Sequence, residues 1–450
     1  MSFFYWVNRV HDFLSGTKVF PLLASLEKSE RLPLGQIRET QWIKLKALIR
    51  HSYENIPYYR DLFSSHGLMP DSIRNFEDYR RIPFLEKKII RQNKERLLLK
   101  GNKRKGRWRR TSGSTGKSLD FFADEETLRY HRALMMRSYG WWGIRPGDRR
   151  AGIWRNWNHP LSIKTFTDVV KRAFLERSIV LPTHLLHDEG MEAFHEKLKS
   201  FKPKLLFGYP SVLAMFSKFI LKRGLEKVDL GLKLIAANSE IFYPDQRKIV
   251  SGVFKGVPVC DIYGTTETGL IAFECPSGAM HLIPETTYVE FEPIPGSENQ
   301  TIIVTPLSNY RMPFLRYDLG DLVQSRAGTC ACGRAFPLID IKIGRRRAFV
   351  VDSEGHKIDP AIIQSVFEHM FPLGQNPVHQ LQLHQTFPGR LKIQVVLDAN
   401  KNTEGQLLTK IQQLLSQKLP LISFELIRVR EIPRDPSGKQ RVLITTLQEA

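Results

Sequence analysis

Apolar residues recur at helical spacing in two stretches near the start of the chain. Residues 36–63 predict an amphipathic helix that ends close to Pro57, because proline disfavours helix in the residue before it. The apolar positions of this helix are Leu45, Leu48, Ile49 and Tyr53. The first twenty residues predict a short helix whose apolar side chains either lie at a membrane interface or pack on the protein's own surface. These side chains are Phe3, Phe4, Trp6, Val7, Val10 and Phe13.

In the middle of the chain, short apolar runs alternate with helical segments. A helix is predicted at residues 127–139, and a second begins with Ser211 as N-cap and stops at Gly224. Strands that alternate with helices form largely parallel sheets, which bind ligands beyond the carboxyl ends of their strands. We therefore expect an α/β fold in which three strand ends face one crevice. The strands in question are residues 205–210, 234–240 and 257–264.

After residue 269 the strand-like runs follow one another more closely and predict an antiparallel β subdomain. These runs are residues 288–291, 301–305 and 322–323. The composition changes at residues 344–347, which contain three arginines. Beyond that point, strands at 391–397 and 425–430 and a helix at 407–419 predict a small α+β domain. The expected boundaries are an N-terminal domain at residues 1–343 and a C-terminal domain at residues 344–450.

The composition is that of a globular protein with an unusual charge. Of its 450 residues, 42% are hydrophobic, enough for a large core, but no apolar run approaches the ~20 residues that cross a bilayer. The aromatic N-terminus lacks a basic lead and a small-residue cleavage site, so it does not predict a signal peptide. Four cysteines favour a reducing cytoplasm over a disulfide scaffold. The formal net charge of +21 favours an anionic partner.

A basic cluster and a glycine-rich loop are adjacent at residues 100–117. The loop combines two glycines, hydroxyl side chains and Lys117, whose donors suit a chain of phosphates. It is not the standard P-loop, because Thr111 stands where that pattern needs a glycine, and a flexible linker is the alternative interpretation. The cluster surrounds Trp108 with basic side chains, but no nucleic-acid module accompanies it. We therefore expect a basic approach to a nucleotide and no nucleic-acid partner.

Five further segments complete an ordered set with this loop. They read Asn-Ile-Pro-Tyr-Tyr-Arg at 55–60, Tyr-Gly-Thr-Thr-Glu-Thr-Gly at 263–269, Arg-Tyr-Asp-Leu-Gly-Asp at 316–321, Gly-Arg at 344–345 and Pro-Arg-Asp-Pro-Ser-Gly-Lys at 433–439. The set resembles the adenylate-forming superfamily, and within it the branch of phenylacetate–CoA ligases and CapK-type capsule-biosynthesis proteins. The resemblance spans nearly the whole chain. It implies a large α/β AMP-binding domain and a small mobile α+β domain that carries a catalytic lysine.

The resemblance implies that a carboxylate attacks the α-phosphate of ATP, which gives an acyl-adenylate and pyrophosphate, before a thioester forms with CoA. It makes Glu267 the Mg²⁺ ligand, places Thr266 at the α-phosphate and lays Lys439 across the transition state. Asp321 would accept both ribose hydroxyls, and Arg345 would reach the ribose from the domain junction. The other nucleotide-binding residues would be Thr111, Ser112, Gly113, Ser114, Thr115, Gly116, Lys117, Ser239, Glu240, Tyr263 and Gly264.

The chain departs from its apparent relatives at the hinge, where they usually carry acidic residues and this chain has Arg346, Arg347 and Ala348. Adenylation is therefore better supported than CoA transfer. The alternatives are a CapK-like adenylating enzyme of surface-polysaccharide biosynthesis with a non-CoA acceptor, and a non-catalytic binding protein. We expect a small carboxylate and a nucleotide as partners, whereas peripheral membrane contact is disfavoured. The identity of the acid stays open, and four indoles either line its site or belong to the core: Trp141, Trp142, Trp154 and Trp157.

Three cysteines and a histidine make a separate candidate metal set. Cys275 lies close to His281 in the sequence, and Cys330 and Cys332 come just after the Asp321 segment. Three thiolates and an imidazole are a common inventory for structural zinc. Their spacing is unlike that of C-x-x-C fingers, and reduced, unconnected cysteines are the alternative.

Overall fold

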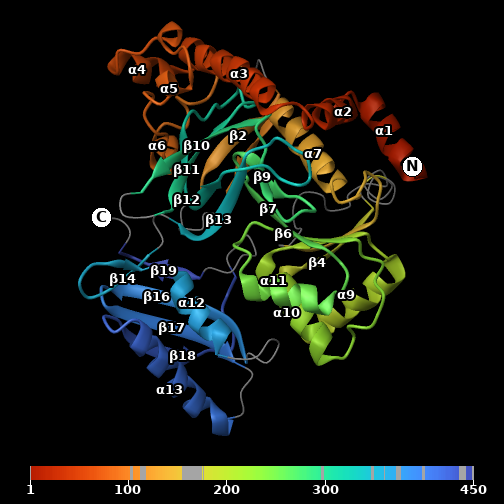
Figure 1. Ribbon diagram of the computed structural model, residues 1–450, viewed down its shortest axis with the longest axis vertical. Helices are drawn as coiled ribbons and strands as arrows, with labels where there is room; N and C mark the ends of the chain where they lie inside the picture. Colours follow the sequence, from red (N-terminus) through yellow and green to blue (C-terminus); the bar gives the residue numbers. More distant parts are fainter. Residues whose placement is uncertain are drawn as a thin grey trace.

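A large sheet with surrounding helices makes up most of the computed structural model, and a smaller α+β unit follows it (Figure 1). Among the described residues no helix is both long and apolar enough to span a membrane. The structure describes residues 2–101, 105–111, 118–154, 175, 177–294, 298–345, 349–358, 360–370, 377–397, 401–434 and 442–447.

Helices dominate the first hundred residues. The predicted helix end before Pro57 is confirmed, because one helix stops at Asn55 and Pro57 opens the next one. Proline suits the first turn of a helix, where its missing N–H would have no partner. The helices are α1 (Phe3–Ser15), α2 (Val19–Ser29), α3 (Leu34–Asn55), α4 (Pro57–Ser65), α5 (Phe76–Tyr79) and α6 (Lys87–Gln92).

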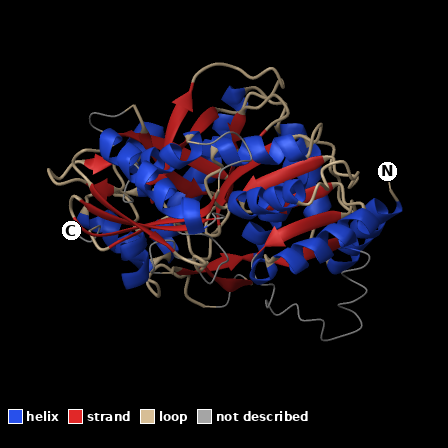
Figure 2. Ribbon diagram, turned by 90° about the horizontal axis from the view of Figure 1, so that it is seen from below, coloured by secondary structure: helices blue, strands red, loops and turns tan. Residues whose placement is uncertain are grey.

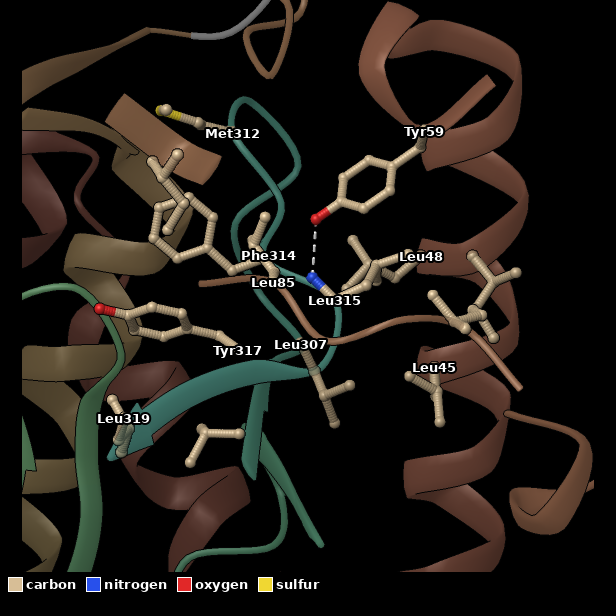
Figure 3. Close-up of a cluster of buried hydrophobic side chains, with 14 of the residues drawn as sticks. Leu45, Leu48, Tyr59, Leu85, Leu307, Met312, Phe314, Leu315, Tyr317 and Leu319 are labelled. Carbon is tan, nitrogen blue, oxygen red and sulfur yellow. Dashed lines mark hydrogen bonds between the residues drawn. The ribbon is translucent and has the colours of Figure 1, made fainter. Parts of the chain in front are cut away.

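Tyr59 ties these helices to the chain segment that leads into the sheet (Figure 3). Its hydroxyl donates a hydrogen bond to the carbonyl of Pro313 at 3.0 Å and accepts one from the N–H of Leu315 at 2.8 Å. The ring is fully buried in a cluster with Leu45 and Leu48 of α3. Tyr59 therefore anchors residues 313–315, just before the strand that begins at Tyr317.

Within the described residues, the central sheet has eleven strands in the order β10-β11-β12-β13-β9-β8-β7-β6-β5-β3-β4. The three predicted parallel strands are confirmed as β5, β6 and β7, which are neighbours. The predicted antiparallel strands are also found, and they continue the same sheet because β9 pairs with both β8 and β13. The bounds are β3 (Arg150–Trp154), β4 (Ser178–Pro182), β5 (Leu205–Gly208), β6 (Leu234–Asn238), β7 (Val259–Thr265), β8 (Gly269–Glu274), β9 (Met280–Leu282), β10 (Thr287–Pro293), β11 (Gln300–Pro306), β12 (Tyr317–Arg326) and β13 (Leu338–Arg345).

Helices pack against the parallel strands, as the view in Figure 2 also shows. The prediction of Ser211 as an N-cap is wrong by two residues: Tyr209 caps this helix, because Pro210 already takes the first helical position. The predicted stop at Gly224 agrees with its φ of 63°, a conformation that glycine adopts without strain. The helices are α7 (Glu125–Gly140), α9 (Asp188–Phe201), α10 (Pro210–Lys222) and α11 (Pro244–Val253).

The smaller unit has its own four-stranded sheet, in the order β18-β17-β16-β19, and its own apolar core. The predicted strand, helix and strand are confirmed as β17, α13 and β18. The domain boundary at residue 343 stays a prediction, and β13 runs past it to Arg345. The elements are β14 (Val350–Val351), β15 (Lys357–Ile358), α12 (Pro360–His369), β16 (Val378–Phe387), β17 (Arg390–Leu397), α13 (Lys401–Lys418), β18 (Ser423–Arg428) and β19 (Leu443–Thr445).

Candidate functional site

Tyr263 and Asp321 meet although they lie 58 residues apart in sequence. The Tyr263 hydroxyl on β7 donates a hydrogen bond to the Asp321 carboxylate on β12 at 2.9 Å. Three strands separate β7 from β12 in the sheet, so a flat sheet would place them about 19 Å apart at about 4.8 Å per strand. The sheet must therefore curl, and its curvature brings two predicted nucleotide-binding residues together. Arg345 is the backbone register partner of Asp321 on the adjacent strand.

Glu267 lies in the tight turn between β7 and β8. A Cβ atom at Gly264 would lie 2.3 Å from the carbonyl oxygen of Gly269, whose own φ is 77°, so both positions require glycine. The Glu267 side chain is buried, and its carboxylate accepts a hydrogen bond from the hydroxyl of Tyr317 at 2.9 Å. Thr266 is half-buried in the same turn. The turn thus fixes a carboxylate near the carboxyl end of a parallel strand.

Glu240 and Ser239 follow the carboxyl end of β6. Ser239 has a φ of 70°, in the left-handed region that is costly for residues other than glycine and is often found at functional sites. The Glu240 carboxylate accepts a hydrogen bond from the N–H of Ser211 at 3.2 Å, at the start of α10. Arg434 donates to the hydroxyl of Ser211 at 3.1 Å. The segment that precedes Lys439 therefore contacts the same end of the parallel strands.

Thr111 bonds to Leu119 across the base of the predicted phosphate-binding loop. Its N–H donates to the carbonyl of Leu119, and its hydroxyl accepts a hydrogen bond from the N–H of Leu119, both at 2.9 Å. Thr111 follows β1 (Gly106–Arg110), which pairs with β2 (Asp120–Asp124), so the predicted loop connects the two strands of a hairpin. Within the predicted basic approach, Arg110 forms an ion pair with Asp120. Lys439 and the loop residues lie outside the described residues; the latter are Ser112, Gly113, Ser114, Thr115, Gly116 and Lys117.

The structure gathers the four predicted metal ligands. One ligand atom from each of Cys275, His281, Cys330 and Cys332 lies within 4.8 Å of all the others. The sulfurs of Cys275 and Cys330 are 3.6 Å apart, and the sulfur of Cys332 is 3.3 Å from Nε2 of His281. Two thiolates on one tetrahedral zinc, each about 2.3 Å from the ion, would be about 3.8 Å apart. The four side chains therefore fit a zinc ion.

The surroundings of this cluster also suit a metal. Nδ1 of His281 is 3.3 Å from the carbonyl of Phe336, the kind of partner that orients a metal-binding imidazole. Burial lowers the pKa of His281 to about 4 and so favours its neutral, ligating form. Burial also disfavours the thiolate of Cys332, but hydrogen bonds with Arg334, Cys330 and Cys275 together outweigh it and lower the pKa of this thiol. All four cysteines of the chain are unbridged.

The described indoles divide between the core and the strand ends. Trp141 packs on Phe273 and donates a hydrogen bond to Glu30, and Trp142 donates to the carbonyl of Glu274, so both have structural roles. Trp154, at the end of β3, stacks on Tyr209 just after β5, with ring centroids 4.1 Å apart. This aromatic pair lies at the carboxyl ends of two parallel strands, the end at which sheets of this kind generally bind ligands. Trp157 lies outside the described residues.

Sequence reasoning assigned no role to Tyr317 or Arg434. Tyr317 lies inside the recognised segment 316–321, so its position gave a signal, but only the fold shows that it holds Glu267. Arg434 lies inside the segment 433–439, and its contact with Ser211 spans 223 residues. Contacts of this length do not follow from local pattern.

The chain is similar to several known proteins over most of its length. Residues 350–446 match the CapK C-terminal domain family. The phenylacetate-coenzyme A ligase of Thermus thermophilus is 26% identical over 75% of this chain and 76% of its own length. Protein CapK of Staphylococcus aureus is 22% identical over 91% of this chain and 89% of its own.

A solved structure has the same fold over most of the chain. The 2-hydroxyisobutyryl-CoA ligase in complex with 2-HIB-AMP superposes with a TM-score of 0.73, covers 92% of this chain and 91% of its own, and is 19% identical. The likeness therefore extends through both the large sheet and the smaller unit. The chain is thus similar to phenylacetate–CoA ligases and to CapK, shares the fold of an adenylate-forming CoA ligase, and matches the CapK C-terminal domain family over residues 350–446.

Proposed function

We propose that the chain activates a small carboxylic acid with ATP, forms an acyl-adenylate and transfers the acyl group to CoA as a thioester. The observation that carries the proposal is the hydrogen bond between Tyr263 and Asp321 in a fold shared with a CoA ligase. Two segments that the sequence assigns to one nucleotide meet there. Relatives named phenylacetate-coenzyme A ligase support the same chemistry.

In the first step a carboxylate oxygen attacks the α-phosphorus. The bond between the α-phosphorus and the oxygen that bridges it to the β-phosphorus breaks, so that pyrophosphate leaves. Both reactants are anions, so the site must supply positive charge and aligned donors. Lys439 and the loop at 112–117 are our candidates for this role. Asp321 would accept the ribose hydroxyls, and Tyr263 would orient its carboxylate, because the phenol already donates to it at 2.9 Å.

Glu267 fits the role of magnesium ligand. Mg²⁺ prefers oxygen ligands and is commonly bound by one carboxylate together with substrate phosphates, whose charge it neutralises. The Glu267 carboxylate is buried and is oriented by Tyr317 from β12, the strand that also carries Asp321. Tyr317 therefore acts as a positioning residue for this carboxylate.

A second candidate function differs only in the acceptor. The match of residues 350–446 to the CapK C-terminal domain, and the coverage of 91% of the chain by CapK, favour an adenylating enzyme whose acceptor is a hydroxyl or an amine. The basic residues Arg346 and Arg347 at the predicted hinge support the same alternative. In either case we place the protein in the cytoplasm, where ATP is available and thiols stay reduced.

We expect ATP-dependent pyrophosphate release with at least one member of a panel of aryl and short acyl carboxylates. Replacing the ribose acceptor in Asp321→Ala should raise the KM for ATP by about tenfold or more, since one or more charge-assisted hydrogen bonds are lost. Coupled pyrophosphate detection measures the activity with each acid and the KM for ATP. Thioester formation after CoA is added shows whether CoA is the acceptor. No ATP consumption with any acid would favour the binding-protein alternative.

We also propose that one zinc ion joins Cys275, His281, Cys330 and Cys332. It would hold the β8–β9 hairpin to the segment between β12 and β13, because two ligands come from each. We expect about one zinc per purified chain by elemental analysis, and a lower melting temperature after chelation. Cys332→Ser should lose most of the metal, whereas Cys260→Ala should keep it, because Cys260 is buried in β7. Less than about a tenth of a zinc per wild-type chain would contradict the proposal.

A further inference from the structure

The outward face of α1 is apolar. Five of the fifteen exposed large hydrophobic side chains in the described part of the chain belong to this one helix. At 100° per residue they fall on one stripe, so they form a continuous patch, whereas isolated exposed side chains are ordinary. Their exposed fractions are Phe3 69%, Trp6 50%, Val10 54%, Phe13 83% and Leu14 77%.

The opposite face of α1 is fixed to the protein. Asp12 is buried, and its carboxylate accepts hydrogen bonds from the N–H groups of Val19 and Phe20 at 2.8 and 2.9 Å, at the start of α2. Burial opposes ionisation of Asp12, but these bonds and one from Thr17 outweigh it and lower its pKa. The Tyr5 ring packs edge-on against Phe20. Half a turn of rotation would hide the apolar stripe, but it would break the Asp12 bonds, so the fold holds the stripe outward.

Exposed cations lie around this helix. Arg9 lies on α1 itself, over the Trp6 ring, and Lys18 lies in the link to α2. Gly147 packs against the backbone of Phe4, and exposed Arg145 and Arg149 lie on either side of it in sequence.

The charged groups near α1 leave the protein surface around this helix positively charged. Asp148 is buried against Lys204 at 2.6 Å, so its charge is already compensated. Arg177 lies over the Phe4 ring at 3.6 Å. An apolar stripe with basic flanks, on a chain of net charge +21, is complementary to an anionic surface with an apolar interior.

We propose that α1 docks the protein on a membrane surface that carries anionic lipid headgroups. The helix lies in the plane of the interface, with its apolar side chains below the headgroups and Arg9 and Lys18 among them. A second copy of the chain fits less well, because a symmetric contact would bring equal positive charges together. Both views place α1 at the edge of the molecule, where a flat surface can reach it (Figures 1 and 2). The docking does not depend on the proposed catalytic activity.

Vesicle cosedimentation tests this directly. We expect the full chain to pellet with phosphatidylcholine vesicles that contain phosphatidylglycerol, and to bind less with pure phosphatidylcholine or at high salt. The double variant Phe13→Ser/Leu14→Ser should lower the partition coefficient by about tenfold or more, because two apolar side chains no longer enter the interface. Phe387→Ser is the matched control, since Phe387 is 65% exposed in the C-terminal unit and should not contribute. Arg9→Gln/Lys18→Gln should reduce the preference for phosphatidylglycerol.

Four results would overturn the proposal. The wild type could stay in the supernatant with both vesicle types, or the Phe13→Ser/Leu14→Ser variant could bind as tightly as the wild type. Equal binding to neutral and anionic vesicles would contradict the proposed preference for anionic lipid headgroups. A dimer in solution that this variant dissociates, without vesicle binding, would assign the stripe to a contact between copies. Thermal melting of each variant checks that it folds, which the exposure of both side chains leads us to expect.

Discussion

Lys439→Ala is expected to lower the rate of adenylate formation by about 10²- to 10³-fold, the usual effect of removing one group that stabilises transition-state charge. Affinity for ATP should change little, because the proposed role of the lysine concerns charge that develops during the attack, and the proposed nucleotide contacts of Asp321 and Tyr263 are unchanged. Pyrophosphate release reports the first quantity, and equilibrium binding of ATP reports the second. The contact of Arg434 with Ser211 supports the assignment, because it brings the chain five residues before Lys439 to the carboxyl end of β5.

The control for this experiment is Lys410→Ala, which removes an exposed lysine from α13 in the same C-terminal unit. Its rate of pyrophosphate release should match that of the wild type, because surface substitutions rarely perturb a fold. If the Lys439→Ala variant released pyrophosphate at the wild-type rate, Lys439 would not be a catalytic residue. Loss of ATP binding together with activity would instead point to misfolding or to a ground-state role in holding the nucleotide.

The parallel half of the sheet could be predicted because its signals are local. Each of β5, β6 and β7 is a short apolar run that ends in polar or glycine residues, and alternation with helices fixes the direction of its neighbours. The union of the parallel and antiparallel strands in one sheet could not be predicted. It depends on β9, a strand of only three residues, Met280–Leu282, whose pairing with β13 spans 57 residues between His281 and Leu338.

For the candidate site, recognised segments identified residues but not their partners. The carboxylate of Asp321 was expected to face a ribose, and the structure shows that Tyr263 also donates to it. For α1 the sequence predicted the helix and its apolar residues but not which face of it is exposed. Its apolar periodicity was visible in the sequence, but periodicity does not tell which face the rest of the protein covers. Asp12 settles that question through its bonds to α2, and Phe4, grouped with the exposed anchors, lies instead beside Gly147.

The buried cluster of charged residues around Arg137 was missed, because in a sequence such residues look like solvated ones. Arg137 of α7 is 1% exposed and contacts Glu285 at 2.5 Å and Glu30 at 3.7 Å. Arg334 contacts Glu30 at 3.3 Å, so two arginines and two glutamates balance one another. The cluster joins α2, α7 and the segments before β10 and β13. It also lies next to the candidate zinc site, because Trp141 donates to Glu30 and packs against His281.

Glu285→Gln is expected to lower the free energy of unfolding by about 3–5 kcal/mol, the cost of leaving a buried charge without its partner. Denaturant unfolding, with the midpoint and slope compared to the wild type, measures it. Arg137→Met combined with Glu285→Gln should recover part of the loss, because Arg334 and Glu30 then remain as a balanced pair. The exposed pair of Arg50 and Asp71, also 2.5 Å apart, gives the control: Asp71→Asn should cost at most about 1 kcal/mol, since water screens it. Equal losses from Glu285→Gln and Asp71→Asn would mean that burial does not set the strength of these ion pairs.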